Sequence, residues 1–166
     1  MPMNPSIAER RIFDGPGTVD EVVVVRDAMQ RPAVALIGRF LIAAVFLLSG
    51  IGKLTDLPGT ATQLDQHGLP YAPTLALIAG IAEVAGAVGL ILGVLTRAAS
   101  VGLILFMIPA TLIFHAFWNF HGAERLPQQI NFVKNLAIIG GLMVLAAFGA
   151  GRSSVDYLVR RTRHRS

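Results

Sequence analysis

Four long apolar segments follow a mixed N-terminal stretch. They cover about residues 34–54, 74–95, 98–118 and 132–150. Each is close to the roughly 20 residues that a helix needs to cross a bilayer. The pattern predicts an all-α integral membrane protein, and the brief Thr96-Arg97 connection predicts a tight antiparallel hairpin of the middle two segments. We therefore expect a left-handed four-helix bundle with up-down-up-down topology.

The first segment has one polar side. At 100° per residue this side collects Arg39, Ala43, Phe46, Gly50 and Lys53, with Ser49 beside them. The two cations lie about 21 Å apart along the helix axis. Lipid cannot satisfy polar groups, so this side is expected to face other helices.

Glu83 lies well inside the second segment, where an isolated carboxylate costs several kcal/mol. It must be paired, protonated or hydrated. Small residues surround it on its face of the helix, so a neighbouring helix can approach closely: Ala76, Ala79, Gly80, Gly86 and Ala87.

Polar side chains also occur near the same end of the other segments, and we expect them to meet in one pocket. These are Lys53, His115, Asn131, Lys134 and Asn135. Lys53 or Lys134 can supply the cation that Glu83 requires. Imidazole titrates near neutral pH, so His115 is a candidate proton carrier.

Structural roles are the alternative for each of these residues. Lys53 and Lys134 can extend to the membrane surface, and His115 can join Trp118 in an interfacial aromatic belt. Glu83 can be part of a purely structural ion pair. Arg39 is interpreted as an anchor at the inner membrane surface, and Pro109 is expected to kink the third helix.

Composition and charge agree with a membrane protein and set its orientation. Hydrophobic residues make up 54% of the chain and charged residues 14%, more apolar than a soluble domain of this length. The net charge of +4 comes from basic tails without interleaved aromatics, which argues against nucleic acid as a partner. Eleven Lys and Arg residues fall on the side of the two tails and three on the other. Both termini are therefore predicted to be cytoplasmic, with a bacterial inner membrane as the location.

The apolar segments and the basic tails divide the chain into three regions. Residues 1–33 are interpreted as a plain flexible cytoplasmic tail, and a short helix at 19–30 on the membrane surface is the alternative. Residues 34–151 form the transmembrane domain, and residues 152–166 form a basic cytoplasmic tail. Lipid head groups can bind the arginines of this second tail.

Cysteine chemistry is excluded, because the sequence contains no cysteine. A membrane haem needs two axial ligands, and His115 is the one histidine within a segment. His67 and His121 lie in the connecting loops at a spacing that matches no metal motif, so no metal site is predicted.

The four segments together resemble the DoxX family of small four-helix membrane proteins. The resemblance rests on RFLIAAVFLLSGIGK, on Glu83 followed by AGAVGLILG, on the His115 end of the third segment and on FVKNLAIIGGLMVL. It covers about residues 32–151. The family takes its name from a subunit of an archaeal terminal quinol oxidase, and other members are linked to oxidative or thiol stress and to resistance against quinone-type electrophiles.

The resemblance implies a subunit of a membrane oxidoreductase system that binds a quinone-like molecule, without making this chain itself an enzyme. Glu83 and His115 would exchange protons. The ligand-binding residues would be Lys53, Glu83, His115, Trp118, Lys134 and Asn135. One alternative is a non-catalytic anchor or assembly partner for a soluble enzyme. Another is a small proton-coupled transporter using Glu83, although the helices carry no second acidic residue. A protein partner or a homo-oligomer is compatible with each hypothesis.

Overall fold

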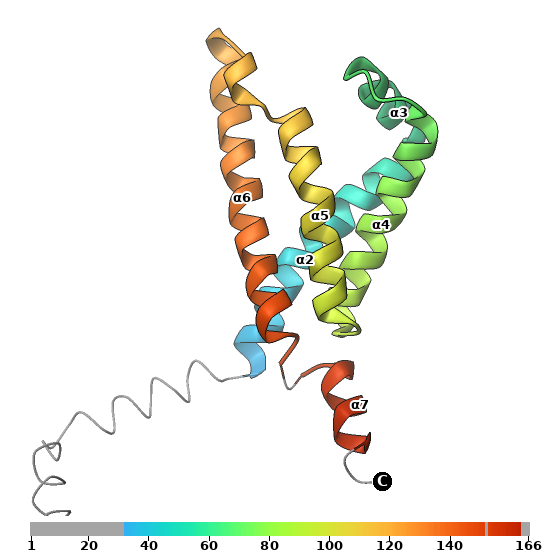
Figure 1. The fold of residues 1–166 in the computed structure, drawn as a ribbon, viewed down its shortest axis with the longest axis vertical. Helices are drawn as coiled ribbons and strands as arrows, with labels where there is room; N and C mark the ends of the chain where they lie inside the picture. Colours follow the sequence, from blue (N-terminus) through green and yellow to red (C-terminus); the bar gives the residue numbers. More distant parts are fainter. Residues whose placement is uncertain (1–31, 152, 164–166) are drawn as a thin grey trace, which may run out of the picture.

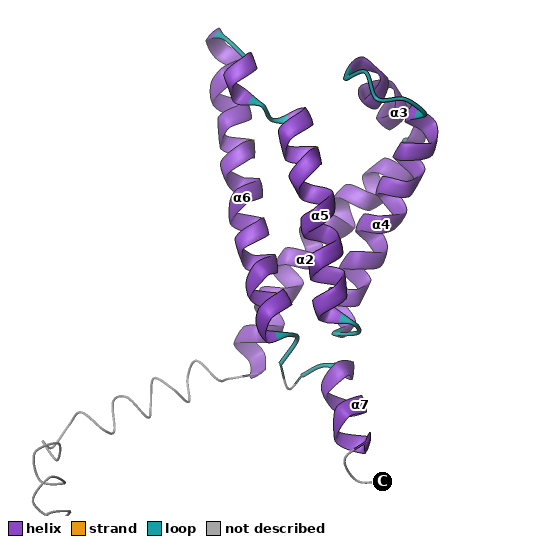
Figure 2. Cartoon of the chain, in the orientation of Figure 1, coloured by secondary structure: helices purple, strands orange, loops and turns teal. Residues whose placement is uncertain are grey.

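The computed structural model describes residues 32–151 and 153–163, and all regular structure in these residues is helical (Figure 1, Figure 2). The alternative helix at 19–30 lies outside them. Four helices in the described part are long and apolar enough to cross a membrane. They are α2 (Pro32–Thr55), α4 (Ala72–Leu92), α5 (Thr96–Phe114) and α6 (Arg125–Phe148). The all-α prediction with four such helices is confirmed.

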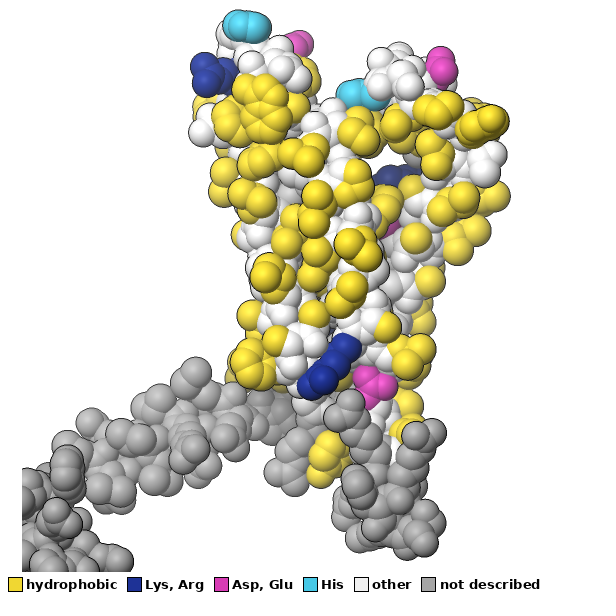
Figure 3. Space-filling model, viewed as in Figure 1, with side chains coloured by type: hydrophobic (Ala, Val, Ile, Leu, Met, Phe, Trp, Pro, Cys, Tyr) yellow, Lys and Arg dark blue, Asp and Glu magenta, His cyan; other side chains and the backbone are white. Residues whose placement is uncertain are grey.

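Hydrophobic side chains cover the body of the bundle in Figure 3, and charged ones gather toward its two ends. The end that carries the α4–α5 turn and the last residues of α6 is called the latch end here. The opposite end, at Thr55, Ala72 and Phe114, is called the cavity end. A helix placed across a bilayer needs this distribution, because lipid stabilises apolar side chains and penalises charges.

Several predicted helix boundaries are wrong by a few residues. The α4–α5 turn consists of residues 93–95, and Gly93 and Leu95 both adopt left-handed backbone conformations with φ of 66° and 48°. At the cavity end α5 stops at Phe114, so Trp118 lies in a separate 3-10 turn, η2 (Phe117–Asn119). A second such turn, η3 (Gly122–Glu124), leads into α6, which starts at Arg125 instead of residue 132.

A short helix, α3 (Leu57–Gln66), occupies much of what was expected to be the first loop at the cavity end. Its start has a local cause: the Asp56 carboxylate accepts a hydrogen bond from the Gly59 amide at 2.9 Å, and Pro58 sits in the first turn. Leu64 packs α3 onto Ala72 and Ala76 of α4, with Phe114 of α5 against them.

The core lies between the four long helices and mixes small with large residues. Its buried members are Ala43, Phe46, Ala87, Leu90, Leu103, Met107 and Leu142. Helices α2 and α4 approach closely where two glycines meet: a Cβ on Gly50 would lie 2.9 Å from the Gly80 carbonyl oxygen. Small residues at a crossing let two backbones pack directly in a membrane.

Arg39 connects α2 to the C-terminal segment at the latch end. The prediction that Arg39 is an anchor at the membrane surface is wrong. The side chain is only 1% exposed. Its guanidinium donates hydrogen bonds to the carbonyl oxygens of Ala150 at 2.6 Å and Ser153 at 2.8 Å. The face predicted for α2 is otherwise confirmed, because Ala43, Phe46 and Gly50 are buried on it as well.

The C-terminal segment returns to the bundle at this end, where a mere tail was expected. It contains a helix, α7 (Val155–Arg163). The Asp156 carboxylate accepts from the amides of Leu95 at 2.9 Å and Thr96 at 3.0 Å, and the Asp156 amide donates to the Gly93 oxygen. Since Leu95 supplies no side-chain cap, Asp156 caps α5 from a distant part of the chain.

Candidate functional site

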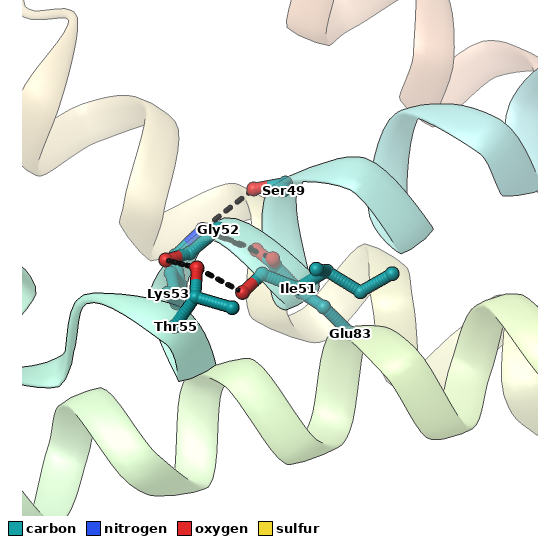
Figure 4. A network of polar contacts seen from close by, with 6 residues as sticks. All are labelled: Ser49, Ile51, Gly52, Lys53, Thr55 and Glu83. Atoms are coloured by element: carbon teal, nitrogen blue, oxygen red, sulfur yellow. Dashed lines mark hydrogen bonds and ion pairs between the residues drawn. The ribbon is translucent and has the colours of Figure 1, made fainter.

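An ion pair between α2 and α4 forms the centre of the candidate site (Figure 4). The Lys53 ammonium donates to both carboxylate oxygens of Glu83, at 3.0 Å and 2.9 Å, and to the Ser49 hydroxyl at 2.6 Å. The Glu83 side chain is 5% exposed and that of Lys53 28%. The carboxylate is therefore paired, as its position in an apolar helix requires.

Local sequence explains why this pair forms. Ser49 and Lys53 are four residues apart on the last turns of α2, so both side chains leave the helix on one side. Glu83 follows Gly80 on α4 by three residues, and Gly80 lies against Gly50. The glycine contact brings the backbones together just where the charges must meet, and all three hydrogen-bonding protons of the ammonium have acceptors.

The ion pair lies on the wall of a cavity of about 570 Å³. Figure 3 shows the cavity end hollowed between two arms of the molecule, with basic and acidic surface visible inside the hollow. Most of the wall is apolar and comes from α2, α4 and α5. Polar groups occur at few positions: Ser49, Lys53, Thr60, Gln63, Glu83, His115 and Asn135. A largely apolar cavity with a few placed polar groups is typical of small-molecule sites.

His115 and Asn135 reach the cavity from the far side of the bundle. His115 ends α5, and its Nδ1 is hydrogen-bonded to Oε1 of Gln128 on α6 at 2.8 Å. Asn135 donates from Nδ2 to the Thr111 hydroxyl at 3.0 Å. Both bonds join α5 to α6 and fix the orientation of side chains that line the cavity.

Two predicted ligand-binding residues do not line this cavity. Lys134 is exposed on α6. Trp118 is 51% exposed and packs edge-on against Phe117 and Phe132, with ring centroids 5.2 Å and 5.6 Å away. This aromatic cluster is the arrangement expected of residues at a membrane interface. The structure thus brings four of the six residues together: Lys53, Glu83, His115 and Asn135.

Helix α3 contributes lining residues that the sequence reasoning missed. Thr60, Gln63 and Leu64 face the cavity from above the ion pair. Asp56 followed by Pro58 is a recognisable helix start, so the sequence did carry a sign of α3. Gln128 and Thr111 were missed because nothing in the sequence tells which polar residues of α5 and α6 meet.

The chemistry of the cavity favours a neutral ligand. Lys53 and Glu83 neutralise each other, and no other charged side chain lines the cavity within residues 32–151 and 153–163. The wall offers hydrogen-bond donors and acceptors on hydroxyl, amide and imidazole groups. In the same residues, no three His, Asp or Glu side chains come together as a metal site.

Comparisons with known proteins place the chain in a family. The DoxX family model matches residues 34–116. The chain is 33% identical to "Inner membrane protein YphA" of Escherichia coli over 76% of its own length and 90% of that protein. It is 32% identical to "Inner membrane protein YqjF" of the same organism, over 76% of its length and 92% of that protein. No solved structure matches.

Proposed function

The chain belongs to the DoxX family of membrane proteins, and we propose that it binds a quinone-like small molecule as a subunit of a membrane oxidoreductase system. The observation that carries the proposal is the neutralised Lys53–Glu83 pair on the wall of an apolar cavity of about 570 Å³. The cavity suits a molecule with an apolar ring and one or two carbonyl groups.

Ser49 marks the place where a carbonyl oxygen would bind. The Lys53 ammonium has three protons, two directed at Glu83 and one at the Ser49 hydroxyl. A ligand carbonyl can replace Ser49 as the third acceptor without breaking the ion pair. The new bond would be charge-assisted like the bond to Ser49 that it replaces, so its main effect would be to orient the carbonyl group.

Proton exchange is assigned to Glu83 and His115, two groups of the cavity wall suited to general acid–base chemistry. Reduction of a quinone to a quinol takes up two electrons and two protons. The electrons would come from a partner protein, since this chain contains no cysteine for thiol redox chemistry or cluster ligation.

The orientation is part of the same proposal. The excess of basic residues in the tails directs both termini and the latch end to the cytoplasm, so the cavity end lies in the outer leaflet. The relatives named as inner membrane proteins support a location in that membrane. A fluorescent protein fused to the C-terminus is expected to fluoresce in the cytoplasm, and alkaline phosphatase fused there is expected to be inactive. The reverse pattern would contradict this orientation.

Mass analysis of small molecules that co-purify with the protein in mild detergent tests the binding function. Ala79 lines the cavity on α4, whereas Ala85 is exposed on the same helix and does not. We expect a quinone or a related carbonyl compound with the native chain and with Ala85→Leu, and its loss in Ala79→Leu. Equal content in all three preparations would contradict binding in this cavity.

A further inference from the structure

Several apolar residues that line the cavity keep much of their surface accessible. Ile78 is 57% exposed, Val45 45% and Leu75 36%, and Pro109 is exposed as well. In the side view of Figure 3 the hollow between the two arms is visible from outside, so the cavity is open on a side of the bundle. We call Leu75, Ile78 and Pro109 the side mouth, because they come from α4 and α5, which spread apart toward the cavity end in Figure 1.

The side mouth lies at the depth of the membrane interior. Ile78 is six residues from the start of α4 at Ala72, about 9 Å along the helix axis. Pro109 is five residues from the end of α5 at Phe114, about 8 Å. Both residues belong to spans long and apolar enough to cross a bilayer. An opening about 8–9 Å below a helix end faces hydrocarbon when the core of the bilayer is about 30 Å thick.

Part of the cavity end is covered by the short helix α3. Helix α3 lies over the cavity, with Leu64 buried against Ala72 and Ala76. Its C-terminal cap His67 places its ring 4.6 Å from the ring of Phe114, so the end of α3 touches the end of α5. The contact covers the cavity end where α3 meets α5.

We propose that the cavity opens sideways into the bilayer and takes a neutral amphiphile from the lipid phase, whose polar head meets Ser49 and Lys53 while its apolar chain passes through the side mouth. This inference rests on the proposed binding function and adds the route and the ligand class. The mouth residues are all apolar, so they suit an alkyl or prenyl chain and offer no hydrogen bonds to a water-soluble ligand.

Tryptophan quenching in lipid vesicles tests the opening without any ligand. Trp118 is the single tryptophan, so Trp118→Phe gives a background without tryptophan. Phe106→Trp then places the probe on the cavity wall, and Leu105→Trp places it on the outside of the same helix, where Leu105 is 65% exposed. Vesicles of phosphatidylcholine brominated on the acyl chains provide a quencher in the lipid, and iodide provides one in the water.

We expect the brominated lipid to quench the Phe106→Trp protein to an extent similar to the Leu105→Trp protein, with little quenching by iodide. Adding Ile78→Phe narrows the side mouth and is expected to reduce lipid quenching in the Phe106→Trp protein but not in the Leu105→Trp protein. Phe114→Trp, also on the wall, serves as the probe if Phe106→Trp fails to fold.

Iodide quenching without lipid quenching would show a cavity open to water and overturn the proposal. Quenching by neither iodide nor brominated lipid would show a closed cavity. An unchanged lipid quenching with Ile78→Phe would show that lipid enters elsewhere. Either result would also overturn the proposal. These outcomes are independent of the binding function, because a cavity can open to the bilayer whether or not it holds a quinone. Failure of the co-purification experiment alone would contradict the function and leave the opening intact.

Discussion

Removing one partner of the Lys53–Glu83 pair is expected to destabilise the bundle strongly. The change Lys53→Met deletes the ammonium that donates to Glu83 at 2.9 Å and 3.0 Å, and leaves a carboxylate that is 5% exposed without its cation. Breaking a buried pair in this way costs about 3–5 kcal/mol. Lys53 keeps 28% of its side chain exposed, so we expect a loss near the lower end, about 3 kcal/mol.

The double variant Lys53→Met/Glu83→Leu separates the cost of an orphaned charge from the value of the pair. Replacing both members with apolar residues is often neutral or stabilising, so the double variant is expected to be more stable than Lys53→Met alone. The free energy of unfolding is measured by titration with a denaturing detergent, followed by circular dichroism. Lys134→Met is the control, because that exposed lysine lies outside the cavity, and its change is expected within about 0.5 kcal/mol. A loss below about 1 kcal/mol for Lys53→Met, or a double variant no more stable than Lys53→Met, would refute the reasoning.

Three further predictions concern helix packing and the latch end. Gly50→Ala places a Cβ 2.9 Å from a backbone oxygen of α4 and is expected to cost about 1–3 kcal/mol. Gly102→Ala meets nothing within 4 Å and is expected to stabilise by about 0.5–1 kcal/mol in the same titration; equal effects would contradict the close crossing. Arg39→Met removes two hydrogen bonds from a charged donor, each worth about 1.5–3 kcal/mol, and should expose residues 153–158 to limited proteolysis; an unchanged cleavage pattern would contradict the latch. Asp156→Ala should cost about 1 kcal/mol and speed hydrogen exchange of the Leu95 amide, and unaltered exchange would show that the cap is not formed.

The four spanning helices could be predicted because lipid imposes a simple requirement of about 20 apolar residues. The buried face of α2 could be predicted for a similar reason, since polar residues at helical spacing must turn toward other helices. Helix α3 was missed because it is too short and too polar to resemble a span, and its packing on α4 depends on Leu64 meeting Ala72 and Ala76. Non-local contacts of this kind are not visible as a periodic pattern.

In the candidate site, too, some features could be predicted from the sequence and others depend on non-local contacts. The pairing of Glu83 with a lysine followed from the cost of an isolated carboxylate, but the choice of Lys53 over Lys134 depends on the Gly50 and Gly80 contact. Arg39 was misjudged because its partners are backbone carbonyls of a segment more than a hundred residues away, and any residue can supply a carbonyl. Side chains with specific partners are easier to predict than those that bind the backbone.

Direct binding of decyl-1,4-benzoquinone to the protein in lipid nanodiscs tests the central claim most directly. The native chain is compared with Ala110→Leu, which fills the cavity from α5, and with Ala98→Leu, an exposed site on the same helix outside the cavity. We predict saturable binding to the native chain and to Ala98→Leu, and only unsaturable partitioning into the lipid with Ala110→Leu. Saturable binding of equal affinity to all three would contradict a ligand site between Lys53 and His115.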